Sequence, residues 1–194
     1  MKKSSDTSKK SKPNVYLIGL SGTGKTRSVQ IVSELLGWPF VEMDGVIEDR
    51  TGKPIADIFS ENGEPYFREL ESRLLKEVAG RGGRIVSTGG GVPVRESNRK
   101  IMKSSGLIVR LTASPYIIHE RLAISAANRS KVVRPLLGND APMQKIENML
   151  VERETAYSIA DVTIDTENKT HEEVAELIAE TWRSSEIGRS NALH

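Results

Sequence analysis

The sequence predicts an α/β domain of three layers, in which helices flank both faces of a five-stranded parallel sheet. Five short apolar runs of strand length alternate with segments whose apolar residues follow the helical period. Strands and helices that alternate in this way are typical of βαβ units on a parallel sheet. The chain has 194 residues, 37% of them hydrophobic, which is sufficient for one domain with a sizeable core.

The first half of the chain supplies three of the expected strands. Behind the first strand, Val29, Val32 and Leu36 recur at helical spacing, and Gly37 is expected to end that helix as its cap. The expected strands are 14–18, 40–44 and 84–88, and the expected helices are 25–36, 55–59 and 64–79.

The second half supplies the other two strands. Thr170 and Glu173 have the spacing of a capping box at the start of the last helix. The segment 123–142 loses the helical period, and because a long irregular stretch in a compact domain is usually functional, we expect a lid there. The expected strands are 107–111 and 162–165, and the expected helices are 97–104, 114–122, 146–160 and 171–182.

Residues 19–26, GLSGTGKT, match the phosphate-loop pattern G-x-x-x-x-G-K-[ST] between the first strand and the first helix. Glycines let the backbone N–H groups approach phosphate oxygens, and the helix that follows presents its positive end to them. We expect Lys25 to reach the β- and γ-phosphates and Thr26 to bind Mg²⁺. The sequence thus predicts an ATP site with Mg²⁺ as cofactor, contacted by Gly22, Thr23, Gly24, Lys25, Thr26 and Arg27.

Other features favour a small-molecule kinase over a nucleotide-driven switch. The strand 107–111 ends in Thr112-Ala113, where a Walker B strand would end in aspartate. A guanine-selecting N-K-x-D motif is absent from the sequence. We therefore expect the γ-phosphate to move onto a small metabolite.

Four further motifs follow the phosphate loop in a fixed order. They are D-x-x-I-E beginning at Asp44, G-E-x-x-F-R-x-x-E ending at Glu71, Gly89-Gly90-Gly91, and R-P-L-L beginning at Arg134. Together with Arg153 and Tyr157 they resemble the shikimate kinase family over nearly all of the expected domain. The resemblance implies the P-loop kinase fold and ATP-dependent phosphorylation of the 3-hydroxyl of shikimate, a step of chorismate and aromatic amino-acid biosynthesis.

The resemblance also implies roles for individual residues. Asp44 corresponds to the residue that binds the acceptor hydroxyls and is the favoured base, and a hydroxyl acceptor does need a carboxylate for its proton. Arg68 and Arg153 match the carboxylate-binding arginines, a task that suits the forked guanidinium group. Backbone N–H groups of Gly89, Gly90 and Gly91 are implied to line the acceptor pocket, within an acceptor-binding segment at about 44–75. The expected catalytic residues are Asp44, Lys25 and Arg134, the last on the lid beside the transferring phosphate.

The sequence departs from the family at two places. Glu42 stands where the family usually has an aspartate tied through water to Mg²⁺, and we expect it to act as a longer metal ligand beside Thr26. An arginine before Arg134 usually lies against adenine, and Arg129 is the nearest candidate.

Two alternatives stay open at this point: another small-metabolite kinase, such as a gluconate kinase, and a kinase-like protein that binds ligands without catalysis. Lys25 and Asp44 are both present, which argues against the second. The acceptor motifs argue against the first, because a cyclic hydroxy acid needs both arginines and a carboxylate.

Composition limits the remaining possibilities. The chain has no cysteine, so disulfides and thiolate metal sites are excluded, and no apolar run has the length of a membrane span. We expect a disordered basic tail at 1–13, the kinase domain at 14–183 and a flexible tail at 184–194. The basic tail at 1–13 is the sole feature that suggests a nucleic-acid or membrane partner, so we expect neither. We expect a monomer. We expect it in the cytoplasm, or in the plastid stroma of a plant after transit-peptide removal.

Overall fold

The computed structural model describes residues 12–128 and 142–185, whose five strands form one parallel sheet in the order β2-β3-β1-β4-β5. Every neighbouring pair in this sheet is parallel, so the predicted sheet is confirmed. The strands are β1 (Asn14–Ile18), β2 (Phe40–Glu42), β3 (Ile85–Ser87), β4 (Gly106–Thr112) and β5 (Val162–Asp165).

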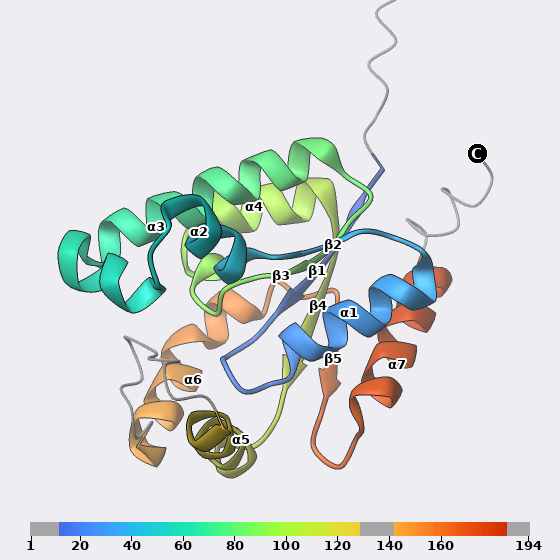
Figure 1. Ribbon diagram of the computed structural model, residues 1–194. Helices are drawn as coiled ribbons and strands as arrows, with labels where there is room; N and C mark the ends of the chain where they lie inside the picture. Colours follow the sequence, from blue (N-terminus) through green and yellow to red (C-terminus); the bar gives the residue numbers. More distant parts are fainter. Residues whose placement is uncertain (1–11, 129–141, 186–194) are drawn as a thin grey trace, which may run out of the picture.

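Helices cover both faces of the sheet, which confirms the three-layer prediction. Figure 1 shows α1 and α7 packed together on one side, while α2, α3 and α4 lie on the other. The helices are α1 (Lys25–Leu36), α2 (Met43–Thr51), α3 (Ile55–Arg81), α4 (Glu96–Ser105), α5 (Pro115–Asn128), α6 (Met143–Tyr157) and α7 (His171–Ser184), with a 3₁₀ turn η1 (Val92–Val94) after β3. Within the described ranges, no helix is both long and apolar enough to cross a bilayer.

The central strand β1 contributes to the core on both of its faces. Tyr16 and Ile18 pack with α2, α3 and α4, whereas Val15 and Leu17 pack with α1 and α7. All four side chains are fully buried. A strand with both faces buried has a continuous apolar sequence, which is why the run at 14–18 was a clear signal.

The second strand is shorter than predicted, and this changes the place of Asp44. The prediction of a strand over 40–44 is wrong at its end, because β2 stops at Glu42 and a helix that was not predicted, α2, begins at Met43. Glu42 caps this helix, since its Oε2 accepts a hydrogen bond of 2.7 Å from the backbone N–H of Gly45. Asp44 therefore lies in the first turn of α2 and not at a strand end.

Several other boundaries differ from the prediction by one to three residues, and two further differences are larger. The helices expected at 55–59 and 64–79 form one element, α3, with a break at Gly63, where φ is 79°. The lid was expected to begin at 123, but α5 continues to Asn128. Ile118 and Leu122 of α5 pack against Ile146 and Met149 of α6. Beyond Leu122 the helix has no apolar period, and alanine at 123, 126 and 127 favours helix there without a buried face.

The topology places the predicted motifs at one edge of the sheet. From β1 the chain moves outward to β2 on one side, returns to β3, and then crosses to β4 on the other side. Ligands of parallel α/β sheets bind beyond the carboxyl ends of strands at such a switch. The phosphate loop follows β1, Glu42 ends β2, and Gly89–Gly91 follow β3, so all three meet at this edge.

The predicted capping box at the start of α7 is present. Thr170 Oγ1 accepts from the Glu173 N–H at 3.1 Å, and the Glu173 carboxylate accepts from the Thr170 N–H at 2.7 Å. We expect Thr170→Ala to lower the free energy of unfolding by about 1 kcal/mol, because it leaves an N–H at the helix start without a partner. Urea denaturation of both proteins measures this, and Ser at 170 should restore most of the loss.

Candidate active site

The phosphate loop forms a closed turn between β1 and α1. Lys25 is buried, with 8% of its surface exposed, and its Nζ donates to the carbonyls of Gly19 at 2.8 Å and Leu20 at 3.0 Å. The Thr23 hydroxyl donates to Leu20 O at 2.8 Å, so this side chain holds the loop together from within. Thr26 and Arg27 are exposed at the start of α1. The helix therefore presents its first N–H groups and a hydroxyl to the space in front of the loop.

A cavity of about 970 Å³ opens in front of the phosphate loop. This volume is at the upper end of the range for small-molecule sites. The predicted site residues that lie in its wall are Gly22, Gly24, Lys25, Thr26, Arg27, Glu42, Asp44, Arg68, Gly89, Gly90, Gly91 and Arg153. The structure thus brings the predicted nucleotide and acceptor residues together around one space.

Asp44 lies in this cavity with one oxygen atom shielded from water. Its Oδ1 is buried and has no hydrogen-bond partner among the described residues. Burial raises the pKa of Asp44 above its ordinary value, while the positive charge of Lys25 acts in the opposite direction. A carboxylate with a free oxygen and a raised pKa is suited to accept a proton from a hydroxyl group.

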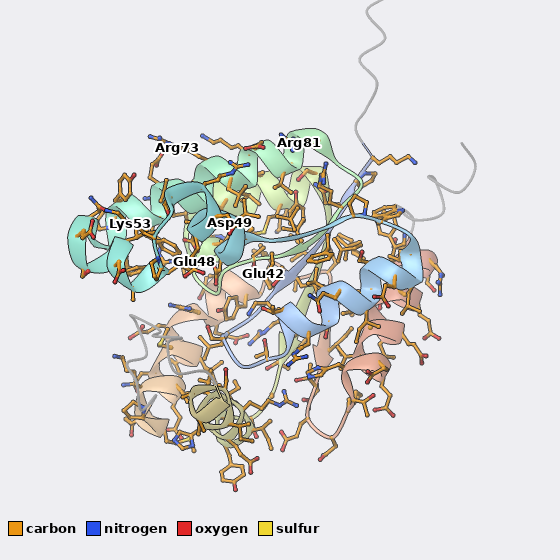
Figure 2. The ribbon with its side chains drawn as sticks, viewed as in Figure 1. Glu42, Glu48, Asp49, Lys53, Arg73 and Arg81 are labelled. Atoms are coloured by element: carbon orange, nitrogen blue, oxygen red, sulfur yellow. The ribbon has the colours of Figure 1, made fainter. Side chains whose placement is uncertain are left out.

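Glu42 and Thr26 offer oxygen atoms to the same cavity from β2 and α1. Figure 2 shows Glu42 at the point where β2 passes into α2, with Glu48 further along that helix. Burial, and then the negative charge of Asp44, raise the pKa of Glu42. A carboxylate and a hydroxyl are the hard oxygen donors that Mg²⁺ prefers, and Mg²⁺ takes its other ligands from water and phosphates. The donors fit this ion, although residues 12–128 and 142–185 hold no cluster of three or more His, Cys, Asp or Glu that could bind a metal alone.

Arg68 is held in place by two carboxylates of its own helix. Its Nη1 donates to Glu71 Oε2 at 2.7 Å, and its Nη2 donates to Glu64 Oε1, also at 2.7 Å. The Glu71 side chain is 1% exposed and the Glu64 side chain 47% exposed. The guanidinium group is therefore fixed from a buried side and from a solvent side, which leaves little freedom in its position.

Arg153 approaches the glycine segment from α6. Its Nη1 donates to the Gly90 carbonyl at 3.1 Å, and the Tyr157 hydroxyl donates to the same oxygen at 2.8 Å. The next residue, Glu154, receives two hydrogen bonds from Arg110 of β4, which joins α6 to the sheet. The second predicted carboxylate-binding arginine is thereby placed at the acceptor side of the cavity.

The glycine segment is close to charged side chains at two positions. A methyl group on Gly91 would overlap the guanidinium group of Arg68. A methyl group on Gly89 would lie 2.6 Å from Glu71 Oε1 and 2.7 Å from Asp44 Oδ1. A side chain at either position would have to displace one of these charged groups, so the triple glycine does more than form a turn.

The opposite end of the cavity carries positive charge. Arg121 of α5 donates to the Thr166 hydroxyl at 2.8 Å and to the Thr166 carbonyl at 2.7 Å, which ties α5 to the loop after β5. The His171 ring lies beside the phosphate loop, 3.7 Å from the position that a Cβ would take on Gly24. Burial, and then Arg121 and Arg27, lower the pKa of His171. This end lies away from Asp44 and Arg153 and is the side on which a nucleoside would extend from the phosphates.

The sequence analysis gave no role to several residues that the structure places at the site. Glu71 and Tyr157 were quoted only as motif positions; Glu71 bonds to Arg68 within α3, whereas the bond of Tyr157 to Gly90 joins α6 to the glycine segment. Arg121 gave no signal beyond one arginine on a helix next to the expected lid. Arg129 and Arg134, predicted for adenine and for the transferring phosphate, lie outside the described residues.

Comparisons with known proteins agree on one family. A protein-family model described as shikimate kinase matches residues 21–183. The shikimate kinase of Thermodesulfovibrio yellowstonii is 40% identical over 177 residues, which are 91% of this chain and 99% of that protein. The shikimate kinase of Geobacter sulfurreducens is 38% identical over 166 residues, or 86% of this chain and 88% of that protein.

Solved structures agree with these relatives. A shikimate kinase from Acinetobacter baumannii in complex with shikimate matches with a TM-score of 0.82 at 32% identity, over 91% of this chain and 96% of that one. A gluconokinase from Sinorhizobium meliloti matches with a TM-score of 0.51 at 16% identity, over 87% of this chain and 90% of that one. At that identity the likeness to the gluconokinase concerns the fold alone.

Proposed function

The chain belongs to the shikimate kinase family, and from this premise we propose how its residues transfer the γ-phosphate of ATP to the 3-hydroxyl of shikimate. The observation that supports the proposal most strongly is that Asp44, Arg68, Arg153 and Lys25 line one cavity. A carboxylate for a hydroxyl and two guanidinium groups for a carboxylate match the functional groups of a cyclic hydroxy acid.

The nucleotide binds along the phosphate loop in this proposal. The backbone N–H groups of Gly22 and Gly24 and the start of α1 hold the phosphates. Lys25, which donates to Gly19 O and Leu20 O in the structure, exchanges these carbonyls for phosphate oxygens. Thr23 supports the loop from within, and Arg27 and Arg121 stand at the nucleoside end. Arg129 and Arg134 complete the ATP contacts from the lid.

The acceptor binds at the other end of the cavity. Arg68 and Arg153 hold its carboxylate, and the segment Gly89–Gly91 lines its ring. Asp44 accepts the proton of the 3-hydroxyl as the oxygen attacks the γ-phosphate, and Arg134 stabilises the charge of the transferring group. The protein contributes mainly position and charge to such a reaction.

Thr26 and Glu42 would hold Mg²⁺ together with the phosphates. When bound, Mg²⁺ neutralises charge on the β- and γ-phosphates. Glu42 caps α2 with Oε2. The same side chain would therefore hold the helix that carries Asp44 in place and bind the metal. A change at Glu42 is therefore expected to affect acceptor and metal binding together.

Several features beyond the reaction stay predictions. We propose that the protein is a monomer. We propose that it acts in the cytoplasm, or in the plastid stroma if the source is a plant. Its proposed partners are ATP and shikimate, without nucleic acid or membrane. We also propose that the kinase domain comprises 14–183 and that its lid lies within the expected segment 123–142, after the end of α5 at Asn128. Size-exclusion chromatography with light scattering tests the oligomeric state directly.

The experiment for the function measures ADP release with ATP, Mg²⁺ and shikimate, with gluconate, quinate and no acceptor in parallel. We expect turnover that depends on shikimate. Phosphorus NMR should identify the product as shikimate 3-phosphate. Faster turnover with gluconate would transfer the assignment to the gluconate kinases. Binding of ATP without turnover on any acceptor would instead support a kinase-like binding protein.

A further inference from the structure

Glu71 is a buried carboxylate whose charge is not fully compensated. Its side chain is 1% exposed, and among the described residues its one hydrogen-bond donor is Arg68. The Oε1 atom of Glu71 is buried without a hydrogen-bond partner in the described ranges. A buried carboxylate oxygen without a donor is costly when the group is ionised, so this position favours the neutral acid.

The surroundings of Glu71 already contain as many acids as bases. Asp44 from α2 faces it across Gly89, and Arg68 on its own helix and Arg153 from α6 are the nearby cations. Arg68 is also paired with Glu64. Asp44 in turn is acted on by Lys25 and Glu48, one of each sign. The guanidinium group of Arg68 is therefore neutralised before any ligand arrives.

An anionic acceptor adds one more negative charge to this cluster. If its carboxylate binds Arg68 and Arg153, as in the function proposed above, the two guanidinium groups face four carboxylates, those of the acceptor, Glu71, Glu64 and Asp44. Glu64 is exposed, so water screens its charge. Glu71 has no such screening, and the repulsion is relieved most directly if Glu71 becomes neutral.

We propose that Glu71 takes up a proton from solvent when an anionic acceptor binds beside Arg68, so that acceptor binding is linked to proton uptake at this side chain. The inference rests on the proposed function, because it needs a carboxylate-bearing acceptor in the cavity. Burial raises the pKa of Glu71 to about 7 before any acceptor is present. The nearby acceptor carboxylate raises this pKa further, so uptake is largest just above pH 7 and small well below it.

Isothermal titration of the full chain with shikimate at pH 8 tests this linkage. Repeating the titration in buffers of different ionisation enthalpy gives the number of protons taken up. We expect net proton uptake in the wild type. The dissociation constant for shikimate should increase as the pH rises above 7, by at most about tenfold per pH unit. Glu71→Gln keeps an oxygen acceptor for Arg68 but has no titrating proton, so its uptake should vanish and its dissociation constant should be nearly independent of pH.

Glu64→Gln is the matched control. It removes the same charge from the same guanidinium group at an exposed position, so it should keep the proton uptake. Shikimate binding without uptake in the wild type would overturn the inference, as would uptake that persists in Glu71→Gln. If shikimate does not bind the wild type at all, the proposed function fails, and the inference fails with it.

A second measurement tests whether a glutamate takes up the proton, and comparison of its spectrum with that of Glu71→Gln identifies the residue. In protein labelled with ¹³C at the glutamate side-chain carboxyls alone, shikimate at pH 8 should move one signal to the position of a neutral acid. Aspartate carboxyls do not appear in this spectrum, so Asp44 is distinguished from Glu71. If no glutamate signal changes while shikimate is bound, Glu71 does not take up the proton.

Discussion

Asp44→Asn is expected to reduce the turnover of shikimate by about 10²–10⁴-fold, the usual contribution of a positioned general base. Asparagine has nearly the same shape and keeps an oxygen in the place of a carboxylate oxygen, but it cannot accept the proton of the hydroxyl. The charge of Lys25 acts on Asp44 in the folded protein. Loss of the Asp44 charge therefore also changes the electrostatic surroundings of Lys25 at the phosphate loop. We expect the dissociation constant for ATP to change much less than turnover.

The control for this prediction is Asp49→Asn. Asp49 is on the same helix, α2 (Figure 2), and it is exposed at the rim of the cavity. Its substitution removes the same charge and should keep most of the turnover. Single-turnover measurements separate chemistry from product release, and a chemical step in Asp44→Asn that is as fast as in the wild type would exclude Asp44 as the base.

Sequence patterns predicted the elements whose signal is local. The helix 25–36 and the strand 162–165 were predicted to the residue, because an apolar period and a glycine or an acid mark their ends. The capping box of α7 is local in the same sense, since Thr170 and Glu173 are three residues apart. Such features need no knowledge of what packs against them.

The misplaced boundaries lie where the apolar period is weak. The strand predicted at 40–44 ends early because Glu42 caps a helix that has almost no apolar period. The helix α5 continues to Asn128 through a segment without an apolar period, in which three alanines favour helix without needing a buried face. An apolar pattern alone therefore marks neither boundary.

The same distinction applies to the site. The phosphate loop and the acceptor motifs were found because each is a short pattern with its own chemistry, and the structure places most of them at one cavity. The supporting contacts were not predicted: Tyr157 and Arg121 bond to residues of other elements, and Glu71 bonds to Arg68 of its own helix but is buried only in the assembled site. Charge compensation in particular is a property of the assembled site, since Arg68 is neutralised by two glutamates whose exposure differs.

Gly91→Ala is expected to raise the KM for shikimate by about 10–100-fold while the protein stays folded. The backbone of Gly91 has φ −95° and ψ −11°, a conformation that alanine adopts without strain. The new methyl group would overlap the guanidinium group of Arg68, so the arginine must move away from its two glutamates. Charge-assisted hydrogen bonds contribute about 1.5–3 kcal/mol each, and the loss of one such bond to the acceptor carboxylate gives the expected change.

Gly80→Ala distinguishes this local effect from a general effect of replacing glycine. Gly80 is in α3, the helix that carries Arg68, and a methyl group there meets no atom within 4 Å. Alanine should stabilise this helix by about 0.5–1 kcal/mol and leave the KM for shikimate unchanged. The KM for ATP should be unchanged in both variants, because Arg68 is at the acceptor end of the cavity. If Gly91→Ala raises both KM values equally, the glycine segment shapes the whole cavity, and its contact with Arg68 is not what positions the acceptor.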